Sequence, residues 1–211
     1  MMARCPAAPR NAPRLMDSPH QSQLPAVFTN RPAAVGEAHR NPVPAEPADP
    51  PAHPLYLPTY DGCYVCGQTH PRGLRIRFFA DERHRIYARF HPDRTQTGYD
   101  DIVHGGVVGA LLDELVGWSV SLHHDRLAYT AELTVRFVKP LKAGRPYLAS
   151  SCLGAGRGKI WEADGAIRDE SGDVFAKARG KYFLLSAEQT AAVAQKLNYQ
   201  PGDLPVFHHA D

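Results

Sequence analysis

The stretch that decides the fold is His104-Gly-Gly-Val-Val-Gly-Ala-Leu-Leu-Asp-Glu-Leu-Val-Gly-Trp-Ser-Val-Ser-Leu122. Its length is that of a helix, and its residues are apolar on almost every side, so the sequence predicts a buried helix. Three glycines, at Gly106, Gly109 and Gly117, lower its helix propensity. We expect them where another element packs closely against the helix backbone.

The segments on both sides of this helix alternate apolar and polar residues, which is typical of half-buried strands. Before the helix, residues 74–79 and 85–90 are predicted to form a hairpin, and residues 91–102 a polar loop. After the helix we expect four strands, at 130–138, 146–153, 159–168 and 174–184, with turns at 140–144, 154–158 and 169–173. A short terminal helix is expected over residues 187–197.

The order of these elements predicts the architecture. Helices between successive strands would indicate a parallel sheet, and their absence here favours an antiparallel one. One long buried helix wrapped by a curved antiparallel sheet of about six strands is the hot-dog fold, in the α+β class.

Composition bounds the domain organisation. The chain has 211 residues, and 13 of its 19 prolines lie in residues 1–58. Such a segment buries too little apolar surface to offset the entropy lost on ordering. The sequence therefore predicts a disordered arm at 1–55, a folded domain at 56–186, and a helix and tail at 187–211. The arm could instead dock a partner, and Met16 is an alternative start.

Charge and cysteine content exclude several classes of function. A net charge of +2 predicts no strong attraction to nucleic acid. No apolar run approaches the roughly 18–20 residues that a bilayer span needs, and no secretory signal is expected. The four cysteines form no disulfide framework of a small secreted domain, so we expect a cytoplasmic protein with no membrane partner.

Several motifs together resemble the hot-dog thioesterases, especially the branch with phenylacetyl-CoA thioesterase, over about residues 60–185. They are His104-Gly105-Gly106, then Asp113 seven residues after the second glycine, with Phe137-Val138-Lys139-Pro140, Gly144, Cys63-Tyr-Val-Cys66-Gly67 and Gly73-Leu74 in support. The resemblance implies an acyl-CoA thioesterase that hydrolyses a thioester to a free acid and coenzyme A. Coenzyme A is then part of the substrate, and no separate cofactor is expected.

The chemistry of the residues agrees with this resemblance. A thioester hydrolase must stabilise an oxyanion and activate water or attack directly. Glycines at a helix start offer unpaired N–H groups, so Gly106, and with it Gly105, is the predicted oxyanion donor. Asp113 on the apolar helix is the predicted general base or nucleophile, since burying a carboxylate without a purpose is costly. A structural, hydrogen-bonded aspartate is the alternative.

Neighbouring residues remain open at this point. Glu114 is the rival carboxylate, about 100° further round the helix. His104 could bind the carbonyl or hold the loop. Thr130 aligns with a hydroxyl that assists the attacking water in related enzymes, but simple alternation points it away from the Leu133 face, so a bulge or a strand end is needed. Related enzymes often carry Asn or Gln before the His-Gly-Gly turn; here Gly98 stands there, with Gln96 nearby.

Distance along the helix implies an oligomer. Seven residues at about 1.5 Å each put Asp113 roughly 10 Å from Gly106, too far to serve one carbonyl within a single chain. A two-fold dimer with antiparallel helices would join Asp113 of one copy to the glycine turn of the other. The resemblance implies the same homodimer, and a dimer of dimers is possible.

Substrate-binding residues are expected at two places. Arg157, Gly158 and Lys159 form a basic glycine-rich turn at which relatives contact coenzyme A, and a merely solvated basic turn is the alternative. Arg136 and Lys139 are lesser candidates. Other residues expected to line the substrate pocket are Val103 and Trp118, with Leu122 and Tyr99, although an aromatic residue on a buried helix is commonly plain core.

The pair Cys63 and Cys66 has the spacing of zinc ligands, with His70 as a conceivable third. No second cysteine pair follows, so we expect no metal and interpret the pair as a tight turn with small buried thiols. The alternatives to an enzyme are an acyl-CoA-binding module acting as a sensor or scaffold, and a hot-dog dehydratase, whose His-Phe-Pro-like motif we do not find.

Overall fold

The computed structural model describes residues 50–207, so most of the predicted arm at 1–55 lies outside the described residues. In chain order the elements are β1 (Leu55–Tyr56), β2 (Phe78–Ala80), β3 (Ile86–Phe90), η1 (Arg94–Gln96), β4 (Thr97–Tyr99), β5 (Ile102–Val103), α1 (Gly105–His124), β6 (Ala128–Phe137), β7 (Tyr147–Arg157), β8 (Ile160–Arg168), β9 (Val174–Leu184) and α2 (Ala187–Ala194).

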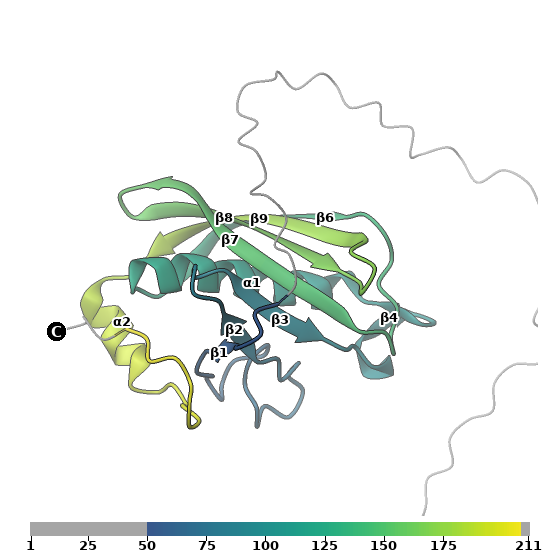
Figure 1. Cartoon of the computed structure of the whole chain (residues 1–211), viewed down its shortest axis with the longest axis horizontal. Helices are drawn as coiled ribbons and strands as arrows, with labels where there is room; N and C mark the ends of the chain where they lie inside the picture. The colour runs from purple at the N-terminus through teal and green to yellow at the C-terminus, as the bar shows by residue number, and fades with distance from the viewer. Residues whose placement is uncertain (1–49, 208–211) are drawn as a thin grey trace, which may run out of the picture. The chain divides into compact units, whose positions relative to one another are not determined.

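Seven strands form one antiparallel sheet in the order β1-β2-β3-β7-β8-β9-β6, and β4 pairs with β5 apart from it. Helix α1 lies along this sheet and contacts β3 and β6 to β9 (Figure 1). The predicted fold, a central helix wrapped by an antiparallel sheet, is confirmed. The sheet has seven strands where about six were expected, because the short β1 pairs with β2 at its edge.

The first predicted strand, residues 74–79, is mostly wrong. Only Phe78–Ala80 joins the sheet, as β2. Arg75 has a positive φ of 55°, which interrupts the extended backbone. The amides of Leu74 and Ile76 donate instead to the carbonyls of Tyr64 and Val65, so this segment pairs with the preceding turn.

The turn predicted at 154–158 is also misplaced. Strand β7 continues to Arg157, which pairs with Ile160 at the start of β8. A two-residue turn remains at Gly158 and Lys159, and Gly158 has the positive φ of 61° that such turns favour. The predicted strands 159–168 and 174–184 correspond closely to β8 and β9.

Helix α1 supplies the centre of the core. Leu111, Leu112 and Leu115 are fully buried, and each such side chain stabilises the fold by about 1.5–3 kcal/mol. Gly117 meets the expectation of close packing, because an added Cβ would lie 3.2 Å from the ring of Tyr182. Gly109 does not, since nothing lies within 4 Å of that position.

By length and composition, α1 is the one helix in the described part of the chain that is apolar enough to cross a membrane, and half of that stretch is buried inside the domain. A core helix meets the same criterion.

The C-terminal segment packs back onto the domain. The amide of Leu204 donates to the carbonyl of Tyr56, Arg77 pairs with Asp203 at 2.6 Å, and the ring of Phe207 stacks on Trp118. The sequence predicts a helix and a tail over residues 187–211. In the structure α2 forms, and residues 198–207 cover one end of α1 and the edge at β1.

The β2–β3 turn is built on one buried carboxylate. Oδ1 of Asp81 accepts from the amides of Arg83 and Arg85, and Oδ2 accepts from Nε of Arg85 at 2.6 Å and from the hydroxyl of Tyr87. Burial alone would raise the pKa of Asp81, but the hydrogen bonds from Arg85 and Arg83 outweigh it and hold the pKa below its ordinary value of 3.8.

We predict that Asp81→Asn lowers the free energy of unfolding by about 1–3 kcal/mol at neutral pH, because an amide nitrogen then faces Nε of Arg85. Since the folded pKa is depressed, the carboxylate stabilises the wild type above pH 3.8, and this contribution is lost as pH falls through the folded pKa. Urea unfolding from neutral pH to about pH 3 should therefore show the two proteins converging.

The neighbouring Glu82→Gln is the matched control, because Glu82 is exposed in the same turn. It should unfold like the wild type at every pH. A difference between Asp81→Asn and the wild type that stays constant down to low pH would contradict this assignment.

Candidate active site

The start of α1 is organised by His104. His104 is the N-cap residue, and its Nδ1 accepts the amide hydrogen of Gly106 at 2.9 Å. The carbonyl of His104 accepts from the amides of Val107 and Val108. The predicted oxyanion donor thus exists at the helix start, but in this structure its N–H already has a partner, the imidazole ring.

A cavity of about 440 Å³ opens in front of this turn. It is lined mainly by apolar side chains of the β4–β5 region and of the segment after β6, together with the helix start: Gly98, Tyr99, Ile102, Val103, His104, Gly105, Val108, Phe137, Val138, Lys139, Pro140 and Leu141. Three residues expected near the substrate, Val103, His104 and Gly105, therefore do share one cavity.

Asp113 lies one and a half to two turns further along α1, in a different cavity of about 270 Å³. Its Oδ1 accepts from the hydroxyl of Thr130 at 2.8 Å and lies 3.0 Å from the hydroxyl of Tyr182. Within residues 50–207, Oδ2 has no hydrogen-bond donor. One carboxylate oxygen is thus held in place, and the other is available to a molecule in the cavity.

A bulge in β6 brings Thr130 to Asp113. The pairing of β6 with β9 shifts register between Thr130 and Glu132, so Ala131 is an extra residue. Beyond the bulge, Leu133 and Val135 face the core, as alternation predicts. The extra residue reverses the alternation, and Thr130 consequently faces α1. The bulge that Thr130 needs in order to face Asp113 is therefore present in β6.

Tyr182 on β9 is the second support of Asp113. Its side chain is 1% exposed, and its hydroxyl lies 2.8 Å from the backbone carbonyl of Asp113 as well as near Oδ1. Burial, followed by the charge of Asp113, raises the pKa of Tyr182 far above its ordinary value. The phenol therefore stays protonated, as a hydrogen-bond donor, at any physiological pH.

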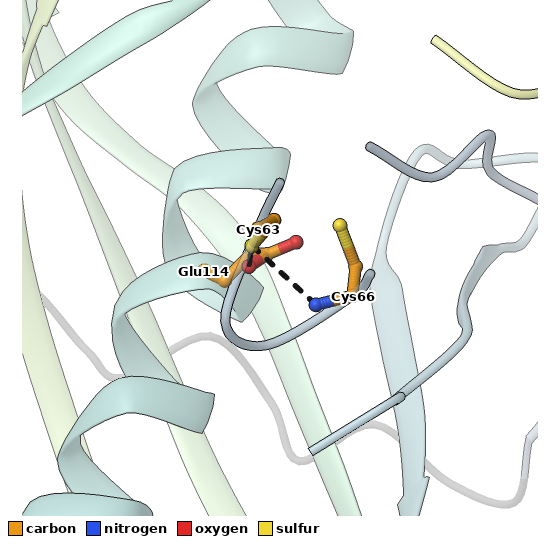
Figure 2. Close-up of side chains that lie close together, drawn as sticks. All are labelled: Cys63, Cys66 and Glu114. Carbon is orange, nitrogen blue, oxygen red and sulfur yellow. Dashed lines mark hydrogen bonds between the residues drawn. The ribbon is translucent and has the colours of Figure 1, made fainter. Parts of the chain in front are cut away.

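The cavity of Asp113 also contains Cys63, Cys66 and Glu114. Sγ of Cys63 and Oε2 of Glu114 are 2.8 Å apart and share a hydrogen bond. Figure 2 shows that Glu114 reaches from α1 toward the loop that carries both cysteines. Asp113 and Glu114 thus diverge, the first toward Thr130 and Tyr182 and the second toward the loop.

The Cys63 thiol and the Glu114 carboxyl group shift each other's pKa. Burial, then the neighbouring Cys63, raises the pKa of Glu114 to about 8. The hydrogen bond from the Cys66 thiol lowers the pKa of Cys63 to about 5, helped by Glu114 and the amides of Cys66 and Val65, and burial opposes this shift.

The predicted basic turn lies elsewhere. Arg157, Gly158 and Lys159 are exposed at the β7–β8 turn and line neither of the two cavities. The ring of His124, at the C-terminal end of α1, lies 4.1 Å from the ring of Trp161 just beyond this turn. The turn is therefore near the opposite end of α1 from Gly106.

Trp118 lines the cavity of Asp113 and stacks on Phe207, with the ring centroids 6.1 Å apart. It is therefore both core and cavity wall. Gln96 caps η1 by accepting from the amide of Asp93 and lines another depression, so the structure does not bring it to Asp113.

Sequence reasoning missed one side chain of this site, Tyr182, and one contact, the hydrogen bond between Glu114 and Cys63. Tyr182 lies in an alternating strand and has no local signal that separates it from a core residue. Glu114 was considered only as a rival to Asp113. Its partner lies 51 residues away in the chain, a distance over which spacing carries no information.

Comparison with known proteins finds a match to one family model. Residues 101–176 match the model of the thioesterase superfamily. A solved thioesterase superfamily protein is 21% identical, with a TM-score of 0.52 over 57% of this chain and 59% of its own, so this chain spans under two thirds of that relative. No curated protein matches the chain.

Two further solved structures are similar in fold. Zebra fish thioesterase superfamily member 2 is 12% identical, with a TM-score of 0.51 over 57% of this chain and 92% of its own. AziG of S. sahachiroi is 16% identical, with a TM-score of 0.50 over 53% and 92%. The segment 101–176, which carries α1, Asp113 and Thr130, thus matches the thioesterase superfamily model, and the domain around it has the hot-dog fold.

Proposed function

We propose that this protein is an acyl-CoA thioesterase and that Asp113 is its catalytic carboxylate. One observation carries the proposal. Asp113 lies on the buried helix of a thioesterase-superfamily domain, with Oδ1 held by Thr130 and Tyr182 and Oδ2 left for a ligand of the cavity. Asp113 is half-buried, so Oδ2 can be reached by a molecule in the cavity that this residue lines.

In the proposed reaction a water molecule adds to the thioester carbonyl, Asp113 accepts its proton, and coenzyme A leaves as the thiol after taking that proton back. Thr130 favours the general-base role over direct attack, since its hydroxyl adjoins Oδ1 and can also hold the water. Single-turnover hydrolysis in ¹⁸O-water distinguishes the two roles. A general base would place the label in the acid product, whereas direct attack followed by hydrolysis at the Asp113 carbonyl would place it in Asp113.

The oxyanion donor of this proposal is the amide of Gly106. A substrate carbonyl would take the place of Nδ1 of His104, which now accepts that hydrogen at 2.9 Å. Backbone amides at a helix start suit this role, since they stabilise negative charge that develops in front of them. His104, released from the amide, then lies beside the same carbonyl.

The proposed active enzyme is a homodimer. Gly106 and Asp113 line different cavities of one chain, in agreement with their separation of roughly 10 Å along α1. Strand β6 is at the edge of the sheet, is ten residues long, and exposes Tyr129 and Phe137. A long unpaired edge of this kind pairs readily with a second copy, and a two-fold axis there would bring two copies of α1 side by side.

The dimer also gives the basic turn a role. Arg157 and Lys159 lie near the C-terminal end of α1, away from the Gly106 turn of their own chain. Antiparallel helices in a dimer bring that end next to the Gly106 turn of the other copy. We infer that Arg157, Gly158 and Lys159 bind coenzyme A phosphates for the site formed with the second copy.

Replacing Asp113 tests the proposal most directly. We expect the wild type to release coenzyme A from members of a panel of short, aromatic and long acyl-CoAs. Asp113→Asn should lose about 10²-fold or more of kcat, the usual effect of removing a general base. Glu188→Gln is the control, because Glu188 is exposed in the first turn of α2.

If the folded wild type turns over no thioester, the hydrolase proposal fails. Binding of acyl-CoAs without turnover would then indicate the non-catalytic module that the sequence left as an alternative. Full activity in Asp113→Asn would reject the carboxylate while leaving the hydrolase.

Tyr182 is expected to act as a positioning residue. Tyr182→Phe removes the hydroxyl that holds Oδ1, so kcat should fall by about 10- to 100-fold, the value of one hydrogen bond to a charged group, while KM stays within about twofold. Tyr199→Phe is the control, because Tyr199 is exposed, lines neither cavity and lies away from the β6 edge. Equal losses in kcat and affinity in Tyr182→Phe would mean that Tyr182 shapes the pocket instead.

Charge at the β6 edge tests the dimer. In Tyr129→Lys/Thr134→Lys, like charges on two copies would face each other across the two-fold axis, and the dimer dissociation constant should rise by about tenfold or more. Ile160→Lys is the control, exposed beyond the edge strand at the β7–β8 turn. Sedimentation velocity measures the association, and a wild type that remains a monomer at assay concentrations while active would reject the shared site.

A further inference from the structure

The turn at residues 60–67 holds two cysteine sulfurs in a network of backbone amides. Sγ of Cys63 accepts from the amides of Val65 at 3.2 Å and Cys66 at 3.4 Å. Sγ of Cys66 lies 3.5 Å from the amide of Tyr60. The two amide donors aimed at Sγ of Cys63 favour its thiolate, which is the form that binds metals.

Helix α1 adds a carboxylate to this turn. Oε2 of Glu114 lies 2.8 Å from Sγ of Cys63, and the ligand atoms of Cys63, Cys66 and Glu114 all lie within 4.8 Å of one another. Figure 2 shows the three side chains converging from two separate parts of the chain. Glu114 is half-buried, and within residues 50–207 it forms no ion pair that would balance its charge.

We propose that Cys63, Cys66 and Glu114 bind one Zn²⁺ ion, with a water molecule from the adjoining cavity as the fourth ligand. Two thiolates and one carboxylate carry three negative charges, which a divalent cation reduces to one. Soft sulfur ligands select zinc over magnesium or calcium. Three protein ligands with one open position form a known class of zinc site.

The ligand geometry is close to what zinc needs. With Zn–S near 2.3 Å and Zn–O near 2.0–2.2 Å, tetrahedral ligand atoms are about 3.5–3.8 Å apart. Cys63 and Glu114 must therefore separate by roughly 0.7 Å, which small side-chain rotations allow.

The ion has a structural consequence for the Asp113 site. It would fasten the turn at 60–67 to α1, one residue from Asp113, and so fix one wall of the cavity that both carboxylates line. The sequence alone favoured a plain turn, because it offered only His70 as a third ligand. In the folded chain Glu114 lies beside both cysteines and can supply the third ligand instead.

The test is metal content of the full-length chain, measured by elemental analysis after dialysis against a metal-free buffer. The wild type should hold about one zinc per chain. Cobalt added in place of zinc should produce the sulfur-to-cobalt charge-transfer band of thiolate ligands. Removal of zinc by a chelator should lower the melting temperature by roughly 5–10 °C, as expected for a ligand present at about 100 times its dissociation constant.

Single substitutions identify the ligands. Cys63→Ser, Cys66→Ser and Glu114→Gln should each weaken zinc binding by more than about 100-fold, beyond the usual effect of changes outside the ligand set. Cys152→Ser is the matched control, a free, half-buried cysteine on β7, and should bind zinc like the wild type. Cys5 is present in every variant and does not affect the comparison. Circular dichroism verifies that each variant is folded.

Three results would overturn the proposal. The first is the absence of zinc and cobalt binding by the reduced wild type. The second is equal binding by all variants, which would identify adventitious sites such as surface histidines. The third is a full cobalt spectrum in folded Glu114→Gln. Because metal content is measured without substrate, none of these results depends on whether the protein hydrolyses thioesters.

Discussion

The structure depends on one constraint: a helix that is apolar on nearly every side carries two consecutive carboxylates near its middle. The sheet wraps α1 to bury Leu111, Leu112 and Leu115, and Asp113 and Glu114 become half-buried beside them, which removes part of the hydration of both carboxylates. Successive residues point about 100° apart on a helix, so the two carboxylates find their hydrogen-bond partners on different elements. Strands β6 and β9 supply the partners of Asp113, and the turn at 60–67 supplies the partner of Glu114.

Irregular backbone makes this arrangement possible. The bulge at Ala131 reverses the alternation of β6, so that Thr130 faces α1 while Leu133 still faces the core. Gly117 lets the ring of Tyr182 pack closely against α1, because an added Cβ would lie 3.2 Å from that ring. A regular β6 strand would turn Thr130 away and leave the carboxylate without one of its two hydroxyl partners.

The two groups proposed for catalysis lie in separate cavities along α1. The glycine turn offers amide donors at the helix start, and Asp113 offers its carboxylate in the middle, each in a cavity of its own. A hot-dog domain built this way is incomplete as a single chain for any reaction that needs both groups at one carbonyl. In the proposed dimer, a second copy would complete it by pairing along β6, which lies at the edge of the sheet.

The sequence by itself determined the buried helix, the antiparallel order of the strands and Asp113 as the candidate carboxylate. These features are local, because periodicity, turn residues and a short motif lie within single segments. It misjudged residues 74–79 and 154–158, where hydrogen bonds to the turn at 60–67 and the pairing of Arg157 with Ile160 override the local pattern. Only the tertiary structure decided the partners of Asp113 and Glu114. Thr130, Tyr182 and Cys63 are 17 to 69 residues away along the chain, and only the closing of the sheet around α1 brings them within hydrogen-bond distance.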